Sequence, residues 1–376
     1  MNTDDSVRNP FETLYTDLAS RKLGGQAIAC SNDFFAEMEN LLKLEEPVFQ
    51  KGVFTERGQL MDGWESRRRR FLPDGTTDDG LEYDWCIVKL GAQGIIRGVN
   101  VDTAHFLGNA PQSVSLEACV SEGNPDDNTE WTDIVARSDV GPGAPHYFAV
   151  ESEQVWTHVR LNMYPDGGIA RLKVYGEVIP DADLFLPGEL IDLAYIKNGA
   201  RPVVCSDMFF SHMENMIMPG RGVNMGDGWE TKRRRTIGDA EKDRFNDWLI
   251  LKLAAKGSIE KVLVDTAHFK GNYPHSFAIE AAVLTEEQAT DVAALEADSH
   301  QDALMAGRAQ PSEINWQPIM DRTRLYDDRE HTFKKEVQNN DQAFTHVRVK
   351  MYPDGGISRV RLWGYPSESL ASVMGK

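Results

Sequence analysis

Cysteine is scarce in this chain. Four of the 376 residues are cysteine, at irregular spacing and without any CxxC pair. Neither a zinc site of the CxxC type nor a dense disulfide framework is therefore expected. Cys30 and Cys205 stand at equivalent points of the repeat described below. We expect the cysteines to be small core residues in a reducing compartment.

Long apolar runs are missing too. No stretch approaches the roughly 18 apolar residues of a membrane span, and residues 1–21 are polar and acidic, without the apolar core of a signal peptide. The formal charge is −19, whereas binding to nucleic acid or to an anionic membrane requires a basic face. We expect a cytoplasmic protein with a small-molecule partner, and neither a nucleic-acid nor a membrane partner.

The motifs of several enzyme classes are also absent. The sequence holds no G-x-S-x-G elbow, P-loop, G-x-G-x-x-G fingerprint or H-E-x-x-H string. Serine-nucleophile, nucleotide-binding and zinc-protease functions therefore have no support from motifs.

What the sequence does contain is an internal repeat. Asp84–Val120 aligns without a gap on Asp247–Val283, with 22 of 37 positions identical. Self-similarity of this kind predicts two copies of one domain. The predicted organisation is an N-terminal extension at 1–22, copies at 23–177 and 199–365, a linker at 178–198, a tail at 366–376, and an insertion at about 285–310, expected to be a solvated helix or a mobile loop.

Each copy has the pattern of a β-rich fold. Thr157–Tyr164 alternates apolar and polar residues, as a strand with one buried face does. Tyr164–Ile169 contains Pro-Asp-Gly-Gly and predicts a tight hairpin turn into a further strand. Short helical pieces are expected near Phe34–Leu42 and Phe209–Ile217. The fold class predicted is all-β: two jelly-roll β-sandwich domains of galactose-binding-like type in tandem.

An Asp-Gly-Trp-Glu string occurs once in each copy and is followed by a basic run. A turn with a solvated basic run, or a plain network of ion pairs, would explain it. Alternatively, one or two arginines bind a substrate carboxylate through paired hydrogen bonds. Its occurrence in both copies favours a function, and the candidate substrate-binding residues are Asp62, Glu65, Arg68, Asp227, Glu230 and Arg233.

A second repeated string, Asp-Thr-Ala-His-Phe, follows an apolar strand. Loops at strand ends are where functional sites are usually built. The aspartate could simply cap the turn and the histidine could be a core residue, but Asp and His three apart in both copies favour a role in catalysis. The catalytic candidates are Asp102, His105, Asp265 and His268, and Asn109 and Asn272 in the turns that follow are substrate-binding candidates.

A glutamate stands among apolar residues in the next strand of each copy. Such a residue either pairs with an arginine or acts as an acid or base. Glu117 and Glu280 are therefore further catalytic candidates, and Arg160 and Arg348, on the polar face of a later strand, are further substrate-binding candidates. The Asp-Gly-Gly turns at Asp166 and Asp354 are interpreted as turn chemistry only.

Taken together, these strings resemble those of the allantoicase family over nearly the whole chain. The resemblance is carried by Phe34–Leu42, Asp62–Arg68 and Val101–Phe106 with Gly108 and Asn109, and by their equivalents in the second copy. It implies hydrolysis of allantoate to urea and ureidoglycolate in purine breakdown for nitrogen. On this hypothesis, Glu65 and Arg68 help bind substrate while Asp102 and His105 transfer protons. The equivalent roles in the second copy belong to Glu230, Arg233, Asp265 and His268.

Several alternatives stay open from the sequence. Without the resemblance, a non-catalytic tandem jelly roll that binds carbohydrate or another small ligand would compete with a hydrolase. A third alternative makes one copy catalytic and the other a structural remnant, although both copies keep the Asp-Gly-Trp-Glu and Asp-Thr-Ala-His strings. No cofactor is certain: Asp, Glu and His could hold a divalent metal, but their spacing fixes no geometry. A homo-oligomer is expected, of unspecified size.

Overall fold

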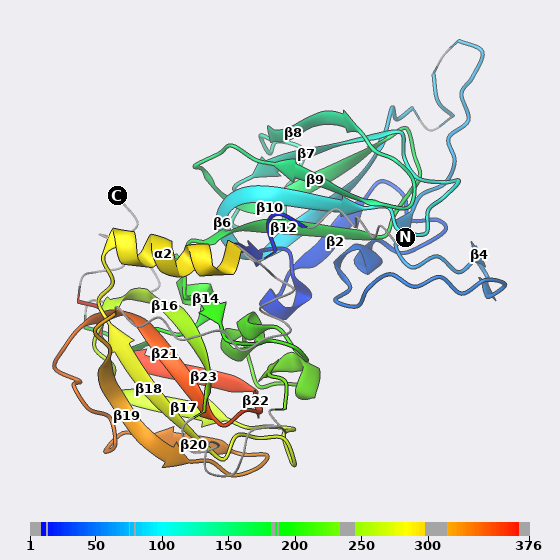
Figure 1. Ribbon diagram of the computed structural model, residues 1–376. Coiled ribbons are helices and arrows are strands. Elements are labelled where there is room, and N and C mark those ends of the chain that lie inside the picture. The colour runs from blue at the N-terminus through cyan, green and yellow to red at the C-terminus, as the bar shows by residue number, and fades with distance from the viewer. Residues whose placement is uncertain are drawn as a thin grey trace. The chain divides into compact units, whose positions relative to one another are not determined.

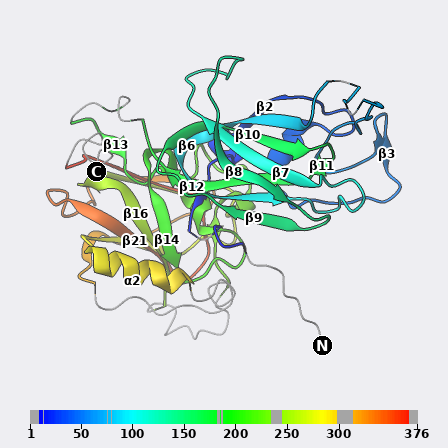
Figure 2. The same cartoon turned by 90° about the horizontal axis from the view of Figure 1, so that it is seen from above.

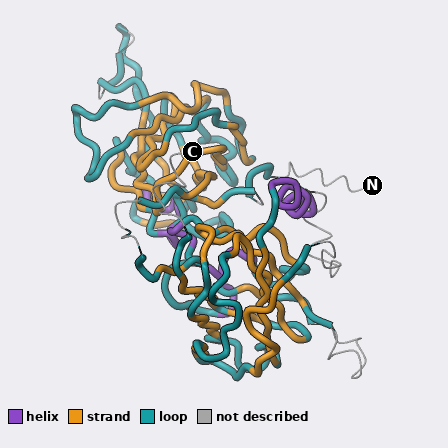
Figure 3. The backbone as a smooth tube through the Cα atoms, turned by 90° about the vertical axis from the view of Figure 1, so that its left-hand side faces the viewer, coloured by secondary structure: helices purple, strands orange, loops and turns teal. Residues whose placement is uncertain are grey.

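The structure is a computed structural model that describes residues 9–12, 14–74, 76–78, 80–181, 185, 188–233, 245–297 and 314–367. The chain forms two compact units, residues 1–179 and 180–376. Strands dominate the described part of both units, and helix is confined to short 3-10 turns and one α-helix (Figure 3). No helix among the described residues is both long and apolar enough to cross a membrane.

In the first unit one long strand joins the two layers of an eight-stranded antiparallel sheet. The first half of β6 (Asp84–Asp102) pairs with β2 (Gln26–Cys30) and β10 (Val155–Tyr164), and its second half pairs with β9 (Pro145–Ala149) and β12 (Arg171–Val178) (Figure 1). The remaining elements are β1 (Thr16–Asp17), η1 (Arg21–Leu23), η2 (Met38–Leu42), β3 (Phe54–Thr55), β4 (Gly58–Gln59), β5 (Trp64–Glu65), β7 (Ser113–Cys119), β8 (Thr132–Asp139) and β11 (Gly168–Ile169).

The second unit repeats this plan with the long strand divided. β16 (Asp247–Gly257) belongs to a five-stranded sheet in the order β14-β16-β21-β18-β19, and β17 (Lys261–Asp265) to a four-stranded sheet in the order β13-β23-β17-β20. The other elements are β13 (Ile191–Asp192), η4 (Ile196–Asn198), β14 (Arg201–Cys205), η5 (Met213–Ile217), η6 (Met225–Asp227), β15 (Trp229–Glu230), β18 (Ser276–Ala282), α2 (Glu286–Ala297), β19 (Gln317–Arg324), β20 (Glu330–Phe333), β21 (Phe344–Tyr352), β22 (Gly356–Ile357) and β23 (Arg359–Gly364).

The core of each unit lies between its sheets and follows the strand alternation. In β10 the side chains of Val159, Leu161 and Met163 are fully buried in the core cluster. Apolar side chains on alternate positions of facing strands are what hold a sandwich together. The tandem jelly-roll prediction is confirmed, and so are the two predicted short helical pieces, which are the 3-10 helices η2 and η5.

One sequence expectation was wrong, and a second gains detail. The Tyr164–Ile169 turn is not a hairpin, because β10 and β12 each pair with a different half of β6 rather than with each other. It instead carries the chain from one sheet of the sandwich to the other. The insertion contains α2, which is not fully solvated: Val292 is buried against the outer side of β14 and β16. The rest of the insertion, beyond Ala297, lies outside the described residues.

Candidate active site

The position of Glu65 follows from its neighbour Trp64. The Trp64 indole is fully buried and donates its Nε1–H to the Asn32 carbonyl at 2.9 Å. Successive side chains of a strand point to opposite sides, so burial of Trp64 turns Glu65 away from the core. Trp229, which donates to the Asp207 carbonyl at 2.9 Å, orients Glu230 in the same way.

His105 sits on a turn held by its neighbours on both sides. The Asp102 carboxylate accepts the Ala104 backbone N–H at 2.8 Å, and the Phe106 side chain is fully buried. His105 has a φ of +69°, and its equivalent His268 has +71°. Non-glycine residues rarely adopt this left-handed conformation, which persists where the surroundings enforce it. Its presence in both units shows that the fold fixes the direction of the imidazole.

The imidazole of His105 has one defined hydrogen bond. Its Nε2 lies 3.0 Å from the Pro47 carbonyl oxygen, and the His268 Nε2 lies 2.8 Å from the Gly222 carbonyl oxygen. A carbonyl oxygen only accepts, so the hydrogen belongs on Nε2 in the neutral ring and the Nδ1 lone pair is left to accept a proton. Phe49 stacks on the His105 ring, with centroids 6.1 Å apart and an interplanar angle of 25°.

Glu65 is hydrogen-bonded to the turn after His105. The Asn109 side-chain amide donates to Glu65 Oε1 at 2.6 Å, and Asn272 donates to Glu230 Oε1 at 2.5 Å. Burial raises the pKa of Glu65, and the opposing effects of the Asn109 hydrogen bond and of the Arg68 charge do not cancel this rise. Glu65 therefore keeps its proton to a higher pH than an ordinary glutamate.

Arg68 is held at the edge of this site by two acceptors. Its Nη1 donates to Asp166 Oδ1 at 2.8 Å and its Nη2 to the Gly108 carbonyl at 3.0 Å. The second unit repeats both bonds, from Arg233 to Asp354 at 2.7 Å and to the Gly271 carbonyl at 2.8 Å. A guanidinium carries five N–H donors, so other donors are left for a ligand.

A pocket of about 460 Å³ joins these groups in the first unit. Polar side chains of Gln59, Glu65, His105 and Asn109 meet apolar ones in its wall, and the remaining lining residues are Phe35, Phe49, Gly58, Met61, Leu107 and Gly108. A mostly apolar wall with a few placed polar groups, in a volume of roughly 300–1,000 Å³, is typical of small-molecule sites.

A larger groove of about 770 Å³ runs elsewhere in the first unit and shares only Phe35 and Met61 with this pocket. The groove is acidic and thus unsuited to an anion, with lining charges from Glu37, Lys43, Glu45, Glu46, Glu56, Arg57 and Asp62. The smaller pocket is the better candidate because its lining contains the half-buried Glu65 carboxyl and the hydrogen-bonded His105 imidazole.

Several predicted residues lie outside the pocket lining. Asp102 caps its turn, and its equivalent Asp265 also pairs with Arg221 Nε at 2.9 Å. Asp62 accepts hydrogen bonds from Arg171 and Lys43. Burial favours a raised pKa for Asp62, but these two bonds outweigh it and the pKa is lowered. Asp227 pairs in the same way with Arg359.

Glu117 and Arg160 pair with each other and do not line the pocket. Arg160 donates to both Glu117 oxygens, at 2.7 and 2.9 Å, and Asn162 donates to one of them. The pKa of Glu117 is lowered because these hydrogen bonds outweigh the effect of burial. In the second unit Glu280 accepts from Arg348 and Lys350. A carboxylate held in this way stays ionised, which does not suit a proton donor.

Two kinds of residue in or beside the site could not be identified as functional from the sequence. Asp166 and Asp354 were interpreted as turn residues, yet their buried carboxylates hold Arg68 and Arg233. The signal available was their place in a long identical string. The wall residue Phe49 had no signal, because its segment has no counterpart of equal length in the second copy.

No group of three His, Cys, Asp or Glu side chains within the described ranges is arranged to hold a metal ion. Glu65 and His105, which line one pocket of the first unit, could supply one oxygen and one nitrogen ligand.

Comparison with known proteins gives a consistent result. The model of a family described as "Allantoicase repeat" matches residues 16–179 and again 191–367. A protein of Acinetobacter baumannii described as "Probable allantoicase" is 42% identical over 94% of this chain and 95% of its own, and one of Pseudomonas paraeruginosa is 42% identical over 97% and 99%. The crystal structure of allantoicase from Saccharomyces cerevisiae matches at 34% identity and a TM-score of 0.72, over 95% of this chain and 94% of its own.

Proposed function

The chain belongs to the allantoicase family, and on this premise we propose that it converts allantoate and water into ureidoglycolate and urea at the pocket of the first unit. It is a hydrolase of carbon–nitrogen bonds in linear amidines, within allantoin degradation. Allantoate has a central carbon that bears a carboxylate and two ureido groups. The product carries a hydroxyl where one ureido group was.

Three tasks follow from this chemistry. The site must hold the carboxylate, protonate the departing ureido nitrogen, and remove a proton from the attacking water. The observation that carries the proposal is the shared pocket of Glu65, Asn109 and His105, in which a half-buried carboxyl and a hydrogen-bonded imidazole line one small volume. Pairs of titratable groups in different environments suit opposite roles in acid–base catalysis.

Arg68 binds the substrate carboxylate, which is the first of these tasks. Asp166 and the Gly108 carbonyl fix two of its N–H groups. Arg68 is not itself a lining residue, but its 52% exposed side chain is hydrogen-bonded to Gly108, which lines the pocket. Guanidinium matches a carboxylate with two parallel hydrogen bonds. Fixing the arginine in advance lowers the entropy lost on binding.

Glu65 and His105 share the other two tasks. The proton of Glu65 goes to the ureido nitrogen as the carbon–nitrogen bond breaks, and the electron pair of that bond goes to the nitrogen. The Nδ1 atom of His105 takes a proton from water as the oxygen bonds to the central carbon. We assign Asp102 to holding the turn that presents His105, through its bond to the Ala104 N–H.

Replacement of Glu65 by glutamine tests this assignment. Glutamine can still accept the Asn109 hydrogen bond but has no proton to give, so kcat for urea release from allantoate should fall by about 10²–10⁴-fold. Glu82→Gln, an exposed glutamate outside the pocket lining, is the matched control and should behave as wild type. Unchanged kcat in Glu65→Gln would remove Glu65 from the mechanism.

The assay should be run with and without a chelator. Loss of wild-type activity on chelation would move Glu65 and His105 from proton transfer to metal ligation. No urea release from folded wild-type protein under either condition would refute the proposed function.

A further inference from the structure

The two copies differ in the chain that borders the site. In the first unit the Val48 N–H donates to Asp62 Oδ2 at 3.1 Å, and in the second the Val223 N–H donates to Asp227 Oδ2 at 3.1 Å. These equivalent anchors are joined by thirteen residues, 49–61, in the first copy and by three residues, 224–226, in the second. The first copy therefore has ten additional residues at this point.

The segment 49–61 has an internal structure of its own. Its strands β3 and β4 pair through Phe54 and Gln59, and they lie towards the same end of the unit as β11 (Figure 2). The Gln59 amide donates to the Gln50 and Val53 carbonyls at 2.9 and 2.8 Å. Arg57 donates to the Asp33 carbonyl at 3.1 Å, which ties the hairpin to the rest of the unit.

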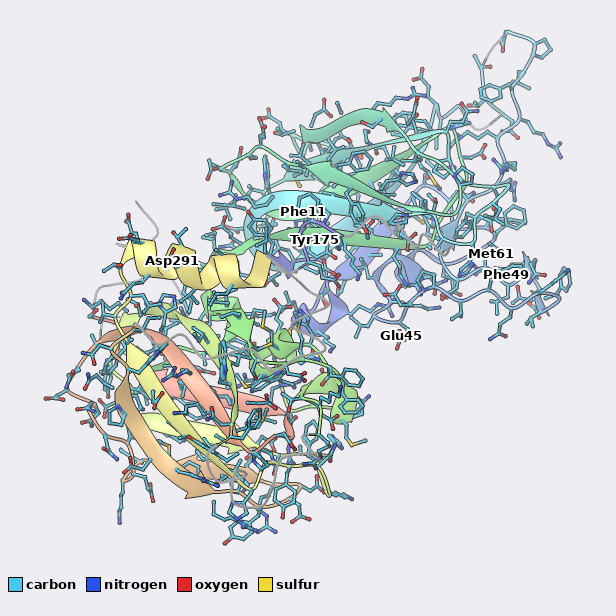
Figure 4. The ribbon with its side chains drawn as sticks, viewed as in Figure 1. Phe11, Glu45, Phe49, Met61, Tyr175 and Asp291 are labelled. Atoms are coloured by element: carbon cyan, nitrogen blue, oxygen red, sulfur yellow. The ribbon has the colours of Figure 1, made fainter. Side chains whose placement is uncertain are left out.

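This segment supplies one wall of the pocket. Phe49, Gly58, Gln59 and Met61 all come from it, and Figure 4 shows Phe49 and Met61 close together. Phe49 also lies against the His105 ring, so it limits the directions open to the imidazole. Without the segment the pocket would lose its outer apolar side.

The second copy has only a short connection at this place. Met225 is 47% exposed, and its sulfur lies 3.6 Å from the Asn272 amide that also bonds Glu230. The polar pair is thus repeated, but a three-residue connection has no equivalent of Phe49 against His268. The same kinds of acid–base group, a glutamate and a histidine, therefore have different surroundings in the two copies.

We propose that segment 49–61 is the specificity-determining wall of the active site, that Phe49 positions His105, and that turnover of the small ureido acid takes place in the first copy, where this wall exists. The inference rests on the proposed function. An apolar wall beside the reacting groups reduces their contact with solvent and restricts the positions of the reacting atoms, and both effects raise the rate of a hydrolysis directed at one carbon.

The first test uses the second copy as a template. Residues 49–61 are replaced by the Asn-Met-Gly sequence of 224–226, which makes the first site resemble the second. Near-complete loss of kcat/KM for allantoate, at least 30-fold, is expected if the first copy performs the turnover. A variant that folds and retains half or more of the wild-type kcat/KM would overturn the proposal, since the short connection would then be sufficient or the second site would carry the rate.

Because the shortened chain could misfold, two point variants test the role of Phe49 in a chain of full length. Phe49→Ala should lower kcat three- to tenfold, in line with the loss of an aromatic contact, and Phe49→Tyr should restore most of it. Phe71→Ala is the matched control outside the segment: Phe71 is 63% exposed and outside the pocket lining, so its kinetics should equal those of wild type. Equal kinetics for Phe49→Ala and Phe71→Ala would overturn the role of Phe49.

Failure of this inference is distinguishable from failure of the proposed function. The variants are compared with a wild type that releases urea. Equal rates in wild type and variants therefore refute the role of segment 49–61 and leave the proposed function intact. A wild-type protein that releases no urea from allantoate refutes the proposed function and, with it, the inference.

Discussion

Asp166→Asn is the change that tests most directly how the arginine of the site is held. The Asp166 carboxylate is almost fully buried, accepts the Arg68 guanidinium at 2.8 Å through Oδ1, and accepts the Arg69 backbone N–H at 2.9 Å through Oδ2. An asparagine has one acceptor oxygen for these two donors and no charge. Arg68 therefore loses its charged partner or shares a neutral one.

The size of the effect follows from the exposure of the pair. A hydrogen bond to a charged group is worth about 1.5–3 kcal/mol, and solvent around the half-exposed Arg68 reduces this to about 1–2 kcal/mol. If Arg68 holds the substrate carboxylate, this difference corresponds to an increase of about five- to thirtyfold in KM. Because Arg68 binds the substrate carboxylate equally in the ground state and in the transition state, kcat should change less than KM.

The assay is the steady-state rate of urea release over a range of allantoate concentrations, with the thermal midpoint measured on the same samples. Arg68→Ala and the double variant complete a cycle with Asp166→Asn. The effects on KM should be strongly non-additive, since both changes disturb one contact. A KM within twofold of wild type, together with a lowered thermal midpoint, would make Asp166 a structural residue and refute its role in placing Arg68.

Two further predictions concern stability. Asp84→Asn should lower the free energy of unfolding by about 3–5 kcal/mol, because the fully buried Arg69 guanidinium donates to Asp84 at 2.5 Å; a loss below about 1 kcal/mol in chemical denaturation would contradict this. Burial lowers the pKa of His346 to about 4, so below pH 6.5 the unfolded chain takes up a proton that the folded chain does not. About 2 kcal/mol should be lost between pH 7 and pH 5, and an equally steep pH dependence of unfolding in His346→Gln would show that another group is responsible.

The fold could be predicted because its signals are local and occur twice. Strand alternation around Leu161 and Met163, and long identical strings in the two halves, indicate strands and a duplication without any knowledge of contacts. Which strands pair with one another could not be predicted as well as where the strands lie. The turn at Asp166 looked like a hairpin because its residues suit one, whereas the closure of the sandwich sends the two adjoining strands to different sheets.

Of the predicted site residues, the structure brings together Glu65, His105 and Asn109 and separates Glu117 and Asp102 from them. The first three stand next to turns at one end of the sandwich. Glu117 lies within β7, directly opposite Arg160 in the register with β10. Sequence alone gives the strand but not the register, so the choice between an ion pair and an acid–base role could be made only from the structure.

Identical strings also conceal a difference in charge between the copies. Asp102 and Asp265 both cap their turns through the same backbone bond, at 2.8 and 2.9 Å. Arg221, just before Gly222, pairs with Asp265, whereas the residue just before Pro47 is Glu46. The carboxylate of Asp265 is thus neutralised by Arg221. The first copy has Glu46 in place of this arginine. The two copies share the repeated strings, and their chemistry differs because the loops between those strings differ. Such connecting loops tolerate sequence change.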